Sequence, residues 1–434
     1  MSASAFLWRK MNRAPRLFVG FDVRTTSPAL AHSLAAGMAA TGGDVSLSAS
    51  AYAFGGVLYS GLSLKIDATA FVTASHLPAD WNGIKFYYHD GVGFSEEDNY
   101  AIRDIYLHKE FIAFQDKLTW KEAGAIRISD RFDQYQSFLK EKFSLSRPLR
   151  VVVDCGNGSA SLSAPSALKS CGYDVVPLWC DVDPTFPNRS PEPDEQSLTE
   201  LSHLVAKQKA DFGVGFDADG DRSVIVDNKG RIASPEVVGI LTAKHILASK
   251  GSRGSPSGKP TVLANVECSS MVEKVLERDF TVKRVRVGHT YLTMEAKRTS
   301  AILGMESSGH FVFPEVYFFD DAMLLPLFLG KMLTTGKTVL SEHIDSLPKI
   351  YKAKDTINVA DNKKFGVIEK LAKTLSNNYS IDTVDGIGIR LPKGRVLIRA
   401  SNTSPMIRIT AEADDSENSK QILEKFSSLV KSAL

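Results

Sequence analysis

The chain has 434 residues, a length that predicts two to four domains instead of a single hydrophobic core. Its 52 Lys and Arg and 50 Asp and Glu are interspersed and leave a formal net charge of +2, which argues against nucleic acid as the main partner. The sequence has no apolar run of the length that a secretory signal or a membrane span requires. We therefore expect a cytoplasmic protein without a membrane partner.

The first predicted unit covers residues 17–47 and consists of an apolar strand, a polar turn, a helix and a second strand. Leu30, Leu34 and Met38 recur every four residues, so they predict the buried face of the helix. Ser27 is the predicted N-cap of that helix, because its hydroxyl can accept a hydrogen bond from a free backbone N–H group.

The same plan recurs at residues 150–178 and, more loosely, at residues 261–285. Three strand–helix–strand units predict parallel strand pairing with right-handed crossovers, and therefore an α/β fold. Each unit is followed by one more strand that leads into a polar loop, in TAFVTASH, DFGVGFDADGDR and SAILGMESSGH. Because reactive loops of α/β sheets lie beyond the carboxyl ends of strands, we expect these three loops to line one cleft.

The C-terminal part, from about Ile350, departs from this plan and predicts a smaller α+β domain that ends in a helix around QILEKFSSLVKSA. SKGSRGSPSGKP, residues 249–260, is rich in Gly, Ser and Pro and indicates an interdomain linker. A further boundary is expected near residues 144–148. The predicted domains are residues 1–146, 147–252, 253–348 and 349–434.

Four cysteines are present, and their spacings are irregular, without a C-x-x-C pair. This pattern favours reduced thiols in a cytoplasmic protein over a disulfide framework or a zinc site. The four are Cys155, Cys171, Cys180 and Cys268.

DADGDR, residues 217–222, has three carboxylates within six residues. Such a cluster repels itself unless a cation compensates it, and Mg²⁺ is a hard divalent ion that prefers oxygen ligands. A calcium EF-hand is excluded, because that loop requires Gly at the position of Arg222 and Glu at the position of Asn228. A phosphatase with an aspartate nucleophile and a solvated acidic turn are the alternatives at this point.

TASHLPADWNGIK, residues 73–85, contains Ser75, and the chain has no G-x-S-x-G motif. Ser75 is a weak candidate for acyl transfer, whereas a serine near a metal site is suited to carry a phosphoryl group. His76 and Lys85 are candidates for proton transfer or phosphate contact, although a loop histidine more often has no such role.

Two further loops carry polar groups of other kinds. ESSGH, residues 306–310, offers a carboxylate and a hydroxyl that suit the hydroxyl groups of a sugar. RASNTSP, residues 399–405, follows an apolar strand and offers a guanidinium, hydroxyls and backbone N–H groups that suit a phosphate. For each loop an ordinary polar turn is the alternative.

Together the four loops resemble those of the α-D-phosphohexomutase superfamily, in the family's order, and the resemblance covers nearly the whole chain. TASHLPADWNGIK is similar to the family's phosphoserine loop, DADGDR to its magnesium loop, ESSGH to its sugar-binding loop and RASNTSP to its phosphate loop. The segments VGFDVRTTSP, VVVDCGNGSASLSAP and FPNRSPEP are also similar to family segments.

This resemblance implies three related α/β domains and a distinct last domain around a central cleft. It implies transfer of phosphate between O1 and O6 of a hexose through a phosphoserine and a bound hexose 1,6-bisphosphate. Mg²⁺ is the implied cofactor, and sugar phosphates are the implied ligands. Position by position, Ser75 matches the phosphorylated serine, and its phosphate joins Asp217, Asp219 and Asp221 in the implied Mg²⁺ site.

The other matches are implied in the same way. Lys85 matches a proposed general acid/base, and Arg222 and His289 (in VGHTYL) match active-site contacts. Glu306 and Ser308 match ligands of the sugar hydroxyls. The positions that match the distal-phosphate site are Arg399, Ser401, Asn402 and Thr403.

Two features depart from the family pattern. The printed sequence begins beyond the usual F-G-T-x-G-I-R-G-like segment, and Leu77 stands at the usual Asn of T-A-S-H-N-P. The strings S-N-T-x-P and E-x-S-G-H favour a phosphomannomutase/phosphoglucomutase, with phosphoglucosamine mutase as the second possibility. A sugar-phosphate-binding protein that has lost turnover is the alternative from another class. Both a monomer and a homo-oligomer are open.

Overall fold

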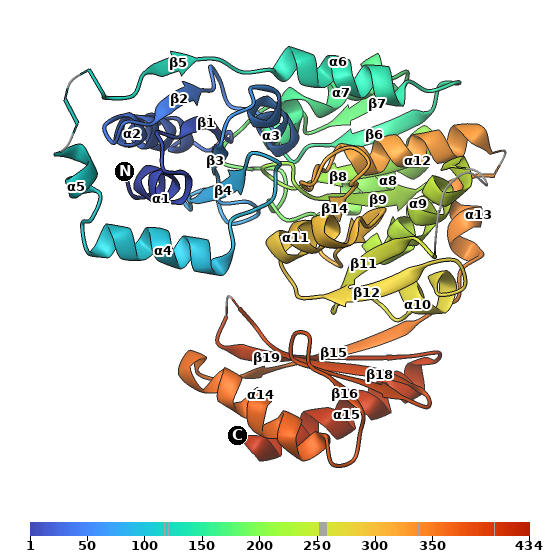
Figure 1. Ribbon diagram of the computed structural model, residues 1–434. Helices are drawn as coiled ribbons and strands as arrows, with labels where there is room; N and C mark the ends of the chain where they lie inside the picture. The colour runs from blue at the N-terminus through green and yellow to red at the C-terminus, as the bar shows by residue number, and fades with distance from the viewer. Residues whose placement is uncertain (117, 120, 251–257, 337, 403) are drawn as a thin grey trace.

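The structure is a computed structural model of residues 1–434, and it describes all of them except residues 117, 120, 251–257, 337 and 403. It contains three α/β units and a C-terminal α+β unit, which confirms the predicted fold class (Figure 1). None of the described helices is long and apolar enough to cross a membrane.

The first unit is built on a five-stranded sheet. Its elements are α1 (Ser2–Met11), β1 (Arg16–Phe21), α2 (Ser27–Ala39), β2 (Asp44–Leu47), α3 (Phe54–Ser63), β3 (Ala68–Val72), β4 (Ile84–Tyr88), α4 (Glu96–Leu107), α5 (Ile112–Gln115), β5 (Ile126–Ile128) and α6 (Phe132–Phe143). The strand order is β4-β3-β1-β2-β5, with β1 parallel to β2 and β3, and with β4 antiparallel to β3.

Helix α2 differs in detail from the prediction. It begins at Ser27, whose hydroxyl donates to Asp22 instead of capping the helix. Its buried face includes Ala31 and Ala35, whereas Leu30, predicted to be buried, is 40% exposed. Small side chains on the facing positions let a helix approach a sheet closely, so the larger leucine lies toward solvent.

The second unit repeats the arrangement with another five-stranded sheet. Its elements are β6 (Arg150–Asp154), the 3₁₀ helix η1 (Ser159–Leu162), α7 (Ala164–Ser170), β7 (Asp174–Leu178), α8 (Thr199–Gln208), β8 (Phe212–Phe216), β9 (Ser223–Asp227) and β10 (Ile232–Ala233). The order is β10-β9-β8-β6-β7, with β6 parallel to β7 and β8, and with β9 antiparallel to β8.

The third unit has a four-stranded sheet in the order β12-β11-β13-β14. Strand β11 is parallel to β12 and β13, and β14 is antiparallel to β13. Its elements are α9 (Pro235–Lys250), β11 (Thr261–Asn265), α10 (Met271–Leu276), β12 (Thr281–Val285), α11 (His289–Thr299), β13 (Leu303–Met305), β14 (Phe311–Val312), α12 (Leu324–Thr335) and α13 (Leu340–Asp345).

The position of α9 bears on the boundary that the sequence suggests at residue 252. This helix lies before that boundary, but it packs against α10, α12 and β13 of the third unit. We therefore propose a boundary near residue 234, and the other predicted boundaries stay proposals. Of the predicted linker 249–260, residues 251–257 lie outside the described part of the chain.

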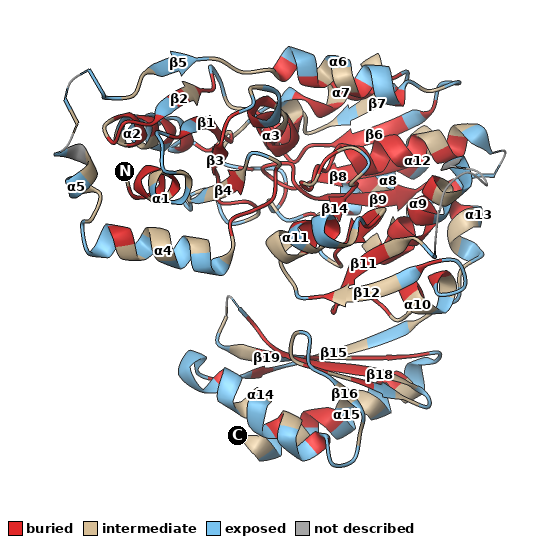
Figure 2. Cartoon of the chain, in the orientation of Figure 1, coloured by how far each residue is buried: buried red, intermediate tan, exposed pale blue. Residues whose placement is uncertain are grey.

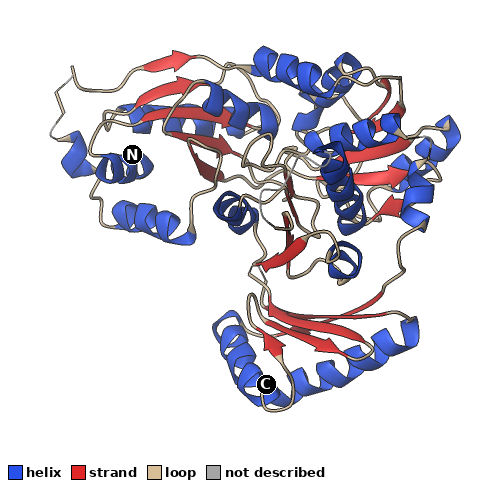
Figure 3. Ribbon diagram, turned by 45° about the vertical axis from the view of Figure 1, so that its right-hand side comes forward, coloured by secondary structure: helices blue, strands red, loops and turns tan. Residues whose placement is uncertain are grey.

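The C-terminal unit is an antiparallel sheet with two long helices on its outer face, turned away from the other units (Figure 3). The strand order is β15-β19-β18-β17-β16. The elements are β15 (Tyr351–Asn358), α14 (Asp361–Leu375), β16 (Ile381–Asp382), β17 (Ile387–Leu391), β18 (Gly394–Ala400), β19 (Met406–Ala413) and α15 (Ser416–Ala433).

Each of the first three units ends its parallel core with the same antiparallel hairpin. The hairpins are β3/β4, β8/β9 and β13/β14. The turns between their strands contain TASH, DADGDR and ESSGH in chain order. The repeat that the sequence suggests therefore places the three polar loops at equivalent positions of the fold.

The first three units share one large hydrophobic core, whereas the C-terminal unit has a separate core (Figure 2). Polar contacts join the C-terminal unit to the third unit. Glu412 accepts the Ser270 N–H at 2.8 Å, and Arg395 donates to the Cys268 carbonyl at 3.0 Å. The fourth unit is thus attached to the others without being part of their core.

Asp321 is a buried carboxylate at the contact between the first and third units. Tyr135 Oη donates to it at 2.8 Å and the Met323 N–H donates at 2.9 Å. It lies so close to Gly55 of α3 that a Cβ there would come within 2.4 Å of the carboxyl group. Burial raises the pKa of Asp321 to about 6, although the hydrogen-bond donors act in the opposite direction.

We expect Asp321→Asn to change how stability depends on pH. The pKa of Asp321 is about 6 in the folded protein against 3.8 for an ordinary aspartate, so the folded state binds the extra proton between these values. Its contribution to the free energy of unfolding is therefore complete below the lower value and falls as the pH rises through the upper one. Asparagine does not titrate, so the variant should lack this decline.

Denaturant unfolding of parent and variant, from about pH 4 to about pH 7, measures the effect. The exposed Asp174→Asn, at an ion pair with Arg150 on the surface, is the control and should follow the parent. Parallel pH profiles for Asp321→Asn and the parent would contradict the prediction.

Candidate active site

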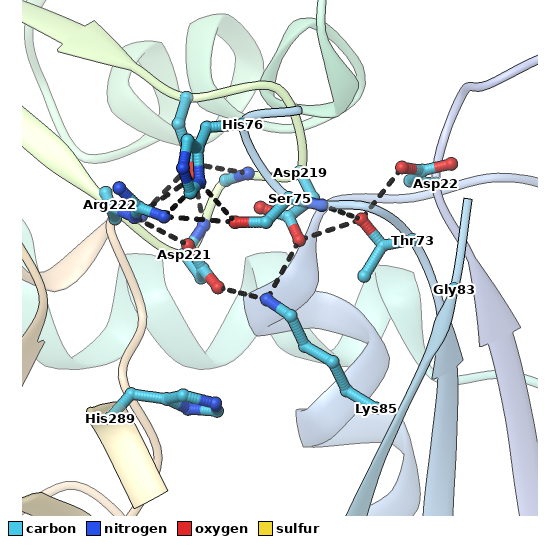
Figure 4. A network of polar contacts seen from close by, with 12 residues as sticks. Asp22, Thr73, Ser75, His76, Gly83, Lys85, Asp219, Asp221, Arg222 and His289 are labelled. Atoms are coloured by element: carbon cyan, nitrogen blue, oxygen red, sulfur yellow. Dashed lines mark hydrogen bonds and ion pairs between the residues drawn. The ribbon is translucent and has the colours of Figure 1, made fainter. Parts of the chain in front are cut away.

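The three hairpin turns meet in space, as the repeated units of the sequence predict. Thr73 Oγ1 lies 2.9 Å from a carboxylate oxygen of Asp219, which connects the first and second turns. The Ser223 N–H donates to the Gly309 carbonyl at 3.3 Å, which connects the second and third turns. Figure 4 shows the polar network where the first two turns meet.

Ser75 lies in the first turn with an unusual backbone conformation. Its φ is 51°, in the left-handed region that non-glycine residues avoid, and the residue is 8% exposed. The Thr73 hydroxyl accepts the Ser75 N–H at 2.9 Å, and the same oxygen lies 2.9 Å from Asp22. Such strain persists only where the surroundings fix it, and it is common at functional sites.

Arg24 holds the backbone of this turn through hydrogen bonds from its guanidinium. Its fully buried guanidinium donates to the carbonyls of Ser75 at 2.6 Å and Leu77 at 2.7 Å, and its Nε pairs with Asp22 at 3.1 Å. The contacts at Leu77 use its backbone, and its side chain is 40% exposed. The turn is therefore fixed by main-chain contacts that do not depend on the identity of residue 77.

The acidic turn is organised around one carboxylate oxygen. Asp217 Oδ1 accepts the backbone N–H groups of Gly220, Asp221 and Arg222 at 3.0, 3.1 and 3.1 Å. Burial raises the pKa of Asp217 well above its ordinary value, and the charges of Asp221 and Asp219 raise it further. The turn thus holds mutually repelling carboxylates in a compact arrangement.

These carboxylates fit a hard divalent cation. One oxygen from each of Asp217, Asp219 and Asp221 lies within 4.8 Å of the others, and all three residues are buried. Among the described residues, nothing donates a hydrogen bond to Asp217 Oδ2, Asp219 Oδ1 or Asp221 Oδ1. Buried acceptors without a hydrogen bond cost free energy that a cation offsets, and an all-oxygen set of this charge suits Mg²⁺.

Lys85 reaches the acidic turn from strand β4. Its Nζ lies 2.7 Å from Asp221 and 3.3 Å from Asp219. Burial alone would lower the pKa of Lys85, but the charges of these two carboxylates raise it well above its ordinary value. The lysine is therefore a fixed positive charge in this arrangement.

Arg222 and His76 lie on the other side of the Ser75 hydroxyl (Figure 4). Arg222 Nη2 is 3.3 Å and His76 Nδ1 is 3.4 Å from Ser75 Oγ, and the arginine also contacts His76 Nδ1. Burial and the charge of Arg222 lower the pKa of His76, which favours a neutral imidazole.

The third turn presents Glu306 and Ser308 as the sequence suggests. Glu306 Oε1 accepts the Gly288 N–H at 2.8 Å, and the Ser308 hydroxyl donates to Glu306 Oε2 at 3.2 Å. Glu306 is 2% exposed, and Gly288 directly precedes His289. The carboxylate therefore has one oxygen tied to the start of helix α11 and one near a hydroxyl.

His289 is one of two histidines at the buried Asp320. Asp320 lies 3.5 Å from His289 Nδ1 and 2.5 Å from His310 Nδ1, and the two imidazoles stack at 5.7 Å. Burial opposes protonation, but the charges of Asp221 and Asp320 raise the pKa of His310 above its ordinary value. No hydrogen bond or ion pair among the described residues joins His289 to Ser75 or the acidic turn.

The fourth loop is placed differently from the other three. Arg399 is 5% exposed, and its guanidinium pairs with Asp385 at 2.9 Å and Glu267 at 3.1 Å. Ser401 is buried and its N–H donates to a backbone carbonyl, whereas Asn402 is exposed. Within the described part of the chain, no hydrogen bond or ion pair joins these residues to the serine or acidic turns. The predicted ligand Thr403 lies outside the described residues.

Several residues that hold this site together are not among those that the sequence predicts. His310 is the last residue of ESSGH and Asp320 lies in the apolar FFDDAM, where a buried carboxylate needs a partner. Asp22 and Arg24 lie in VGFDVR, at the end of an apolar strand. The sequence predicts the strand and the turn after it, but no role for these two side chains. Thr73, which binds the Ser75 N–H and lies next to Asp219, is the last of these residues.

Comparison with known proteins identifies the class of this fold and site. The chain matches four domain models of phosphoglucomutase/phosphomannomutase: α/β/α domain I at residues 1–113, α/β/α domain II at 133–230, α/β/α domain III at 234–351 and the C-terminal domain at 356–429. The chain belongs to the phosphoglucomutase/phosphomannomutase family of the α-D-phosphohexomutase superfamily. It is a phosphohexomutase, an isomerase.

Two relatives and one solved structure illustrate the similarity. A probable phosphoglucosamine mutase of Methanothermobacter thermautotrophicus is 33% identical over 94% of this chain and 88% of the relative. A phosphoglucomutase/phosphomannomutase of Thermococcus kodakarensis is 30% identical over 100% of this chain and 94% of the relative. The crystal structure of a phosphoglucomutase/phosphomannomutase family protein from Burkholderia thailandensis has a TM-score of 0.87 at 26% identity, covering 100% of this chain and 92% of that chain.

We expect Asp219→Asn to weaken Mg²⁺ binding without unfolding the protein. A ligand that binds only the folded state stabilises it by about 2.7 kcal/mol at roughly 100 times its dissociation constant, so Mg²⁺ should raise the parent's thermal midpoint. The variant has one carboxylate fewer and should show a smaller rise. In the absence of Mg²⁺ its midpoint should not fall, because the substitution relieves repulsion with Asp217 and Asp221.

Thermal unfolding with and without Mg²⁺ measures both effects. The control is Asp174→Asn, which removes an exposed carboxylate at the start of strand β7 and should keep the full Mg²⁺ shift. An equal shift in Asp219→Asn and the parent would place the metal elsewhere.

Proposed function

We propose that the protein moves phosphate between O1 and O6 of a hexose, through a phosphate carried by Ser75 and a hexose 1,6-bisphosphate intermediate. The observation that carries this proposal is the position of Ser75 Oγ. It lies in a strained turn 3.3 Å from Arg222 Nη2, beside a turn of three carboxylates, each with an oxygen that accepts no hydrogen bond from the described residues. A hydroxyl held between a cationic side chain and a cation site is suited to phosphoryl transfer.

In the first transfer the phosphoserine reacts with a hexose monophosphate. The bond from Ser75 Oγ to phosphorus breaks as a sugar hydroxyl oxygen bonds to phosphorus. The hydroxyl proton passes to a neutral base, and Ser75 Oγ takes up a proton as it leaves. The products are the bisphosphate and the free serine, so atoms and charge balance.

The charges around Ser75 support these roles. Arg222 is placed to compensate negative charge that develops on Ser75 Oγ. Lys85 adds a positive charge at the acidic turn and is our candidate for the acid, as the family resemblance implies. His76 is the neutral imidazole closest to the hydroxyl and can accept a proton. Mg²⁺ bound by Asp217, Asp219 and Asp221 supplies further positive charge for the phosphoryl group.

The second transfer requires the other phosphate to reach Ser75. The bisphosphate turns over, its second phosphate moves to Ser75, and the isomeric monophosphate leaves. During each transfer the phosphate that does not react needs a distant anchor, and Arg399 with Ser401, Asn402 and Thr403 is our candidate. A phosphate that binds Arg399 replaces Glu267 or Asp385 as its partner, since these carboxylates now occupy the guanidinium. Glu306 and Ser308 are candidates for the sugar hydroxyls.

The preferred hexose is the finer part of this proposal. We propose glucose or mannose phosphate as the substrate, on the strength of S-N-T-x-P and E-x-S-G-H. Phosphoglucosamine mutase is the second candidate, because the Methanothermobacter relative bears that name. Steady-state assays on glucose 1-phosphate, mannose 1-phosphate and glucosamine 1-phosphate, with Mg²⁺ and a bisphosphate activator, rank the three. Binding of all three without turnover of any would favour a binding protein.

We expect Ser75→Ala to lose at least about a thousandfold in kcat, because in this proposal the Ser75 hydroxyl carries the phosphate in both transfers. The purified parent should carry phosphate on the peptide that contains Ser75, and the variant should carry none there. Peptide mass spectrometry and the mutase assay measure the two effects. Ser33→Ala, at an exposed serine of helix α2, is the control. An active Ser75→Ala enzyme with phosphate on another residue would refute the assignment.

We expect Arg399→Ala to raise KM about tenfold or more for both glucose 1-phosphate and glucose 6-phosphate, because it holds whichever phosphate does not react. Ser75 should still accept phosphate from a high concentration of bisphosphate. Initial-rate kinetics in both directions provide the measurement. Arg408→Ala is a matched control. Arg408 lies directly opposite Arg399 on the neighbouring strand β19, but its side chain is exposed. Parent-like KM values in both directions would place the anchor elsewhere.

A further inference from the structure

Two cysteines lie side by side in the second unit, although they are 25 residues apart in sequence. Cys155 directly follows strand β6, and Cys180 follows β7 after one intervening residue. The strands are parallel neighbours, with Asp154 opposite Leu178, and the Cys155 N–H donates to the Leu178 carbonyl at 3.2 Å. Cys180 is one residue out of register with Cys155, and such positions on strands about 4.8 Å apart lie within the Cα separations of about 4.4 to 6.8 Å that disulfides span.

The two sulfur atoms already face each other. Cys180 Sγ lies 3.1 Å from Cys155 Sγ and 3.2 Å from the Val153 carbonyl. All four cysteines of the chain are free thiols in this structure. Closing a bridge of about 2.05 Å therefore requires the two sulfurs to approach by about 1 Å.

The two thiols differ in access and in reactivity. Cys155 is fully buried, whereas Cys180 is partly exposed, because β7 is the edge strand of its sheet. The hydrogen bond with Cys155 lowers the pKa of Cys180, whereas burial raises the pKa of Cys155 well above its ordinary value. Cys180 is thus the thiol that a dissolved oxidant reaches first and the one that ionises more readily, and Cys155 is the partner behind it.

The segment that follows Cys155 packs directly on the acidic turn. The Ser159 N–H donates to the Ala218 carbonyl at 2.8 Å, and the Asn157 N–H donates to the Trp179 carbonyl at 2.8 Å. Gly158 lies so close that a Cβ there would come within 2.6 Å of the Ala218 oxygen. Ala218 separates Asp217 from Asp219, so a movement of this segment changes the positions of the carboxylates.

We propose that Cys155 and Cys180 form a reversible disulfide that lowers the enzyme's turnover. With a hydroperoxide as the oxidant, the Cys180 thiolate attacks the peroxide oxygen, the O–O bond breaks, and a sulfenic acid and water or an alcohol form. The Cys155 sulfur then displaces hydroxide from the Cys180 sulfur, so the disulfide forms and a second water leaves. The peroxide is reduced by two electrons, and the two thiols are oxidised by two. A dithiol reductant reverses the change by thiol–disulfide exchange.

The effect on turnover follows from the distance by which the two sulfur atoms must approach and from the contact of this segment with the acidic turn. A displacement of about 1 Å near reacting groups costs up to about a hundredfold in rate, and two loops share the displacement here. We therefore expect the oxidised enzyme to lose about tenfold in kcat. The bridge itself does not depend on the proposed hexose substrate or on Ser75.

The test treats the full-length protein with hydrogen peroxide and maps its peptides under non-reducing conditions. The expected product is a peptide pair linked through Cys155 and Cys180, with the loss of two hydrogen atoms, together with a loss of activity that dithiothreitol restores. Cys180→Ser should keep the basal activity and lose both the link and the sensitivity to peroxide. Cys171→Ser, in the same unit, should keep both.

Two results would overturn the proposal. One is the absence of the linked peptide after oxidation, including the formation of sulfinic acid or of an adduct at Cys180 alone. The other is a quantitative link with unchanged kcat, because the bridge would then have no effect on the acidic turn. Cys180→Ala provides a second variant, should the serine disturb the packing at Cys155.

Discussion

Repulsion among Asp217, Asp219 and Asp221 is the constraint on which the rest of this site depends. The three buried carboxylates are separated by single residues, and fixed positive charge, together with backbone N–H groups on Asp217, keeps them together in the folded chain. Lys85 from the first unit and Arg222 from the turn itself supply that charge. Lys85 belongs to the first unit and the acidic turn to the second. The compensation of charge in the cluster therefore depends on how the two units pack against each other.

The repeated hairpin brings these charged groups together. Each of the first three units closes its parallel strands with an antiparallel partner, and the turn of that hairpin carries a different chemistry. One shared hydrophobic core fixes the three turns relative to each other, and Asp321 at the contact with Gly55 shows how tight the fit is. The C-terminal unit has its own core and polar contacts to its neighbour, an arrangement that is compatible with the movement that our proposed mechanism requires when the intermediate turns over.

Several sequence predictions agree with the structure for reasons that the residues make clear. The hydrophobic strands that precede TASH, DADGDR and ESSGH are strands of the structure, and their polar ends meet. Helix α9 shows that composition is a limited guide to domain boundaries. The Gly- and Ser-rich segment after α9 predicted a boundary there, but the helix packs against elements of the third unit. Helix α2 shows another limit. A period of four predicted that Leu30 is buried, but the residues that pack closely against the sheet are Ala31 and Ala35.

By itself the sequence determined the fold class, the number of units, the acidic cluster and the loop that holds Ser75, because strand periodicity and local polar motifs are properties of short segments. Only the tertiary structure placed Arg24 against the carbonyls of the serine turn, Asp320 beside His289 and His310, and Glu267 and Asp385 on Arg399. It also brought Cys155 and Cys180 together. These are contacts between residues far apart in the chain, and their partners are set by how sheets and units pack, which no local pattern of residues encodes.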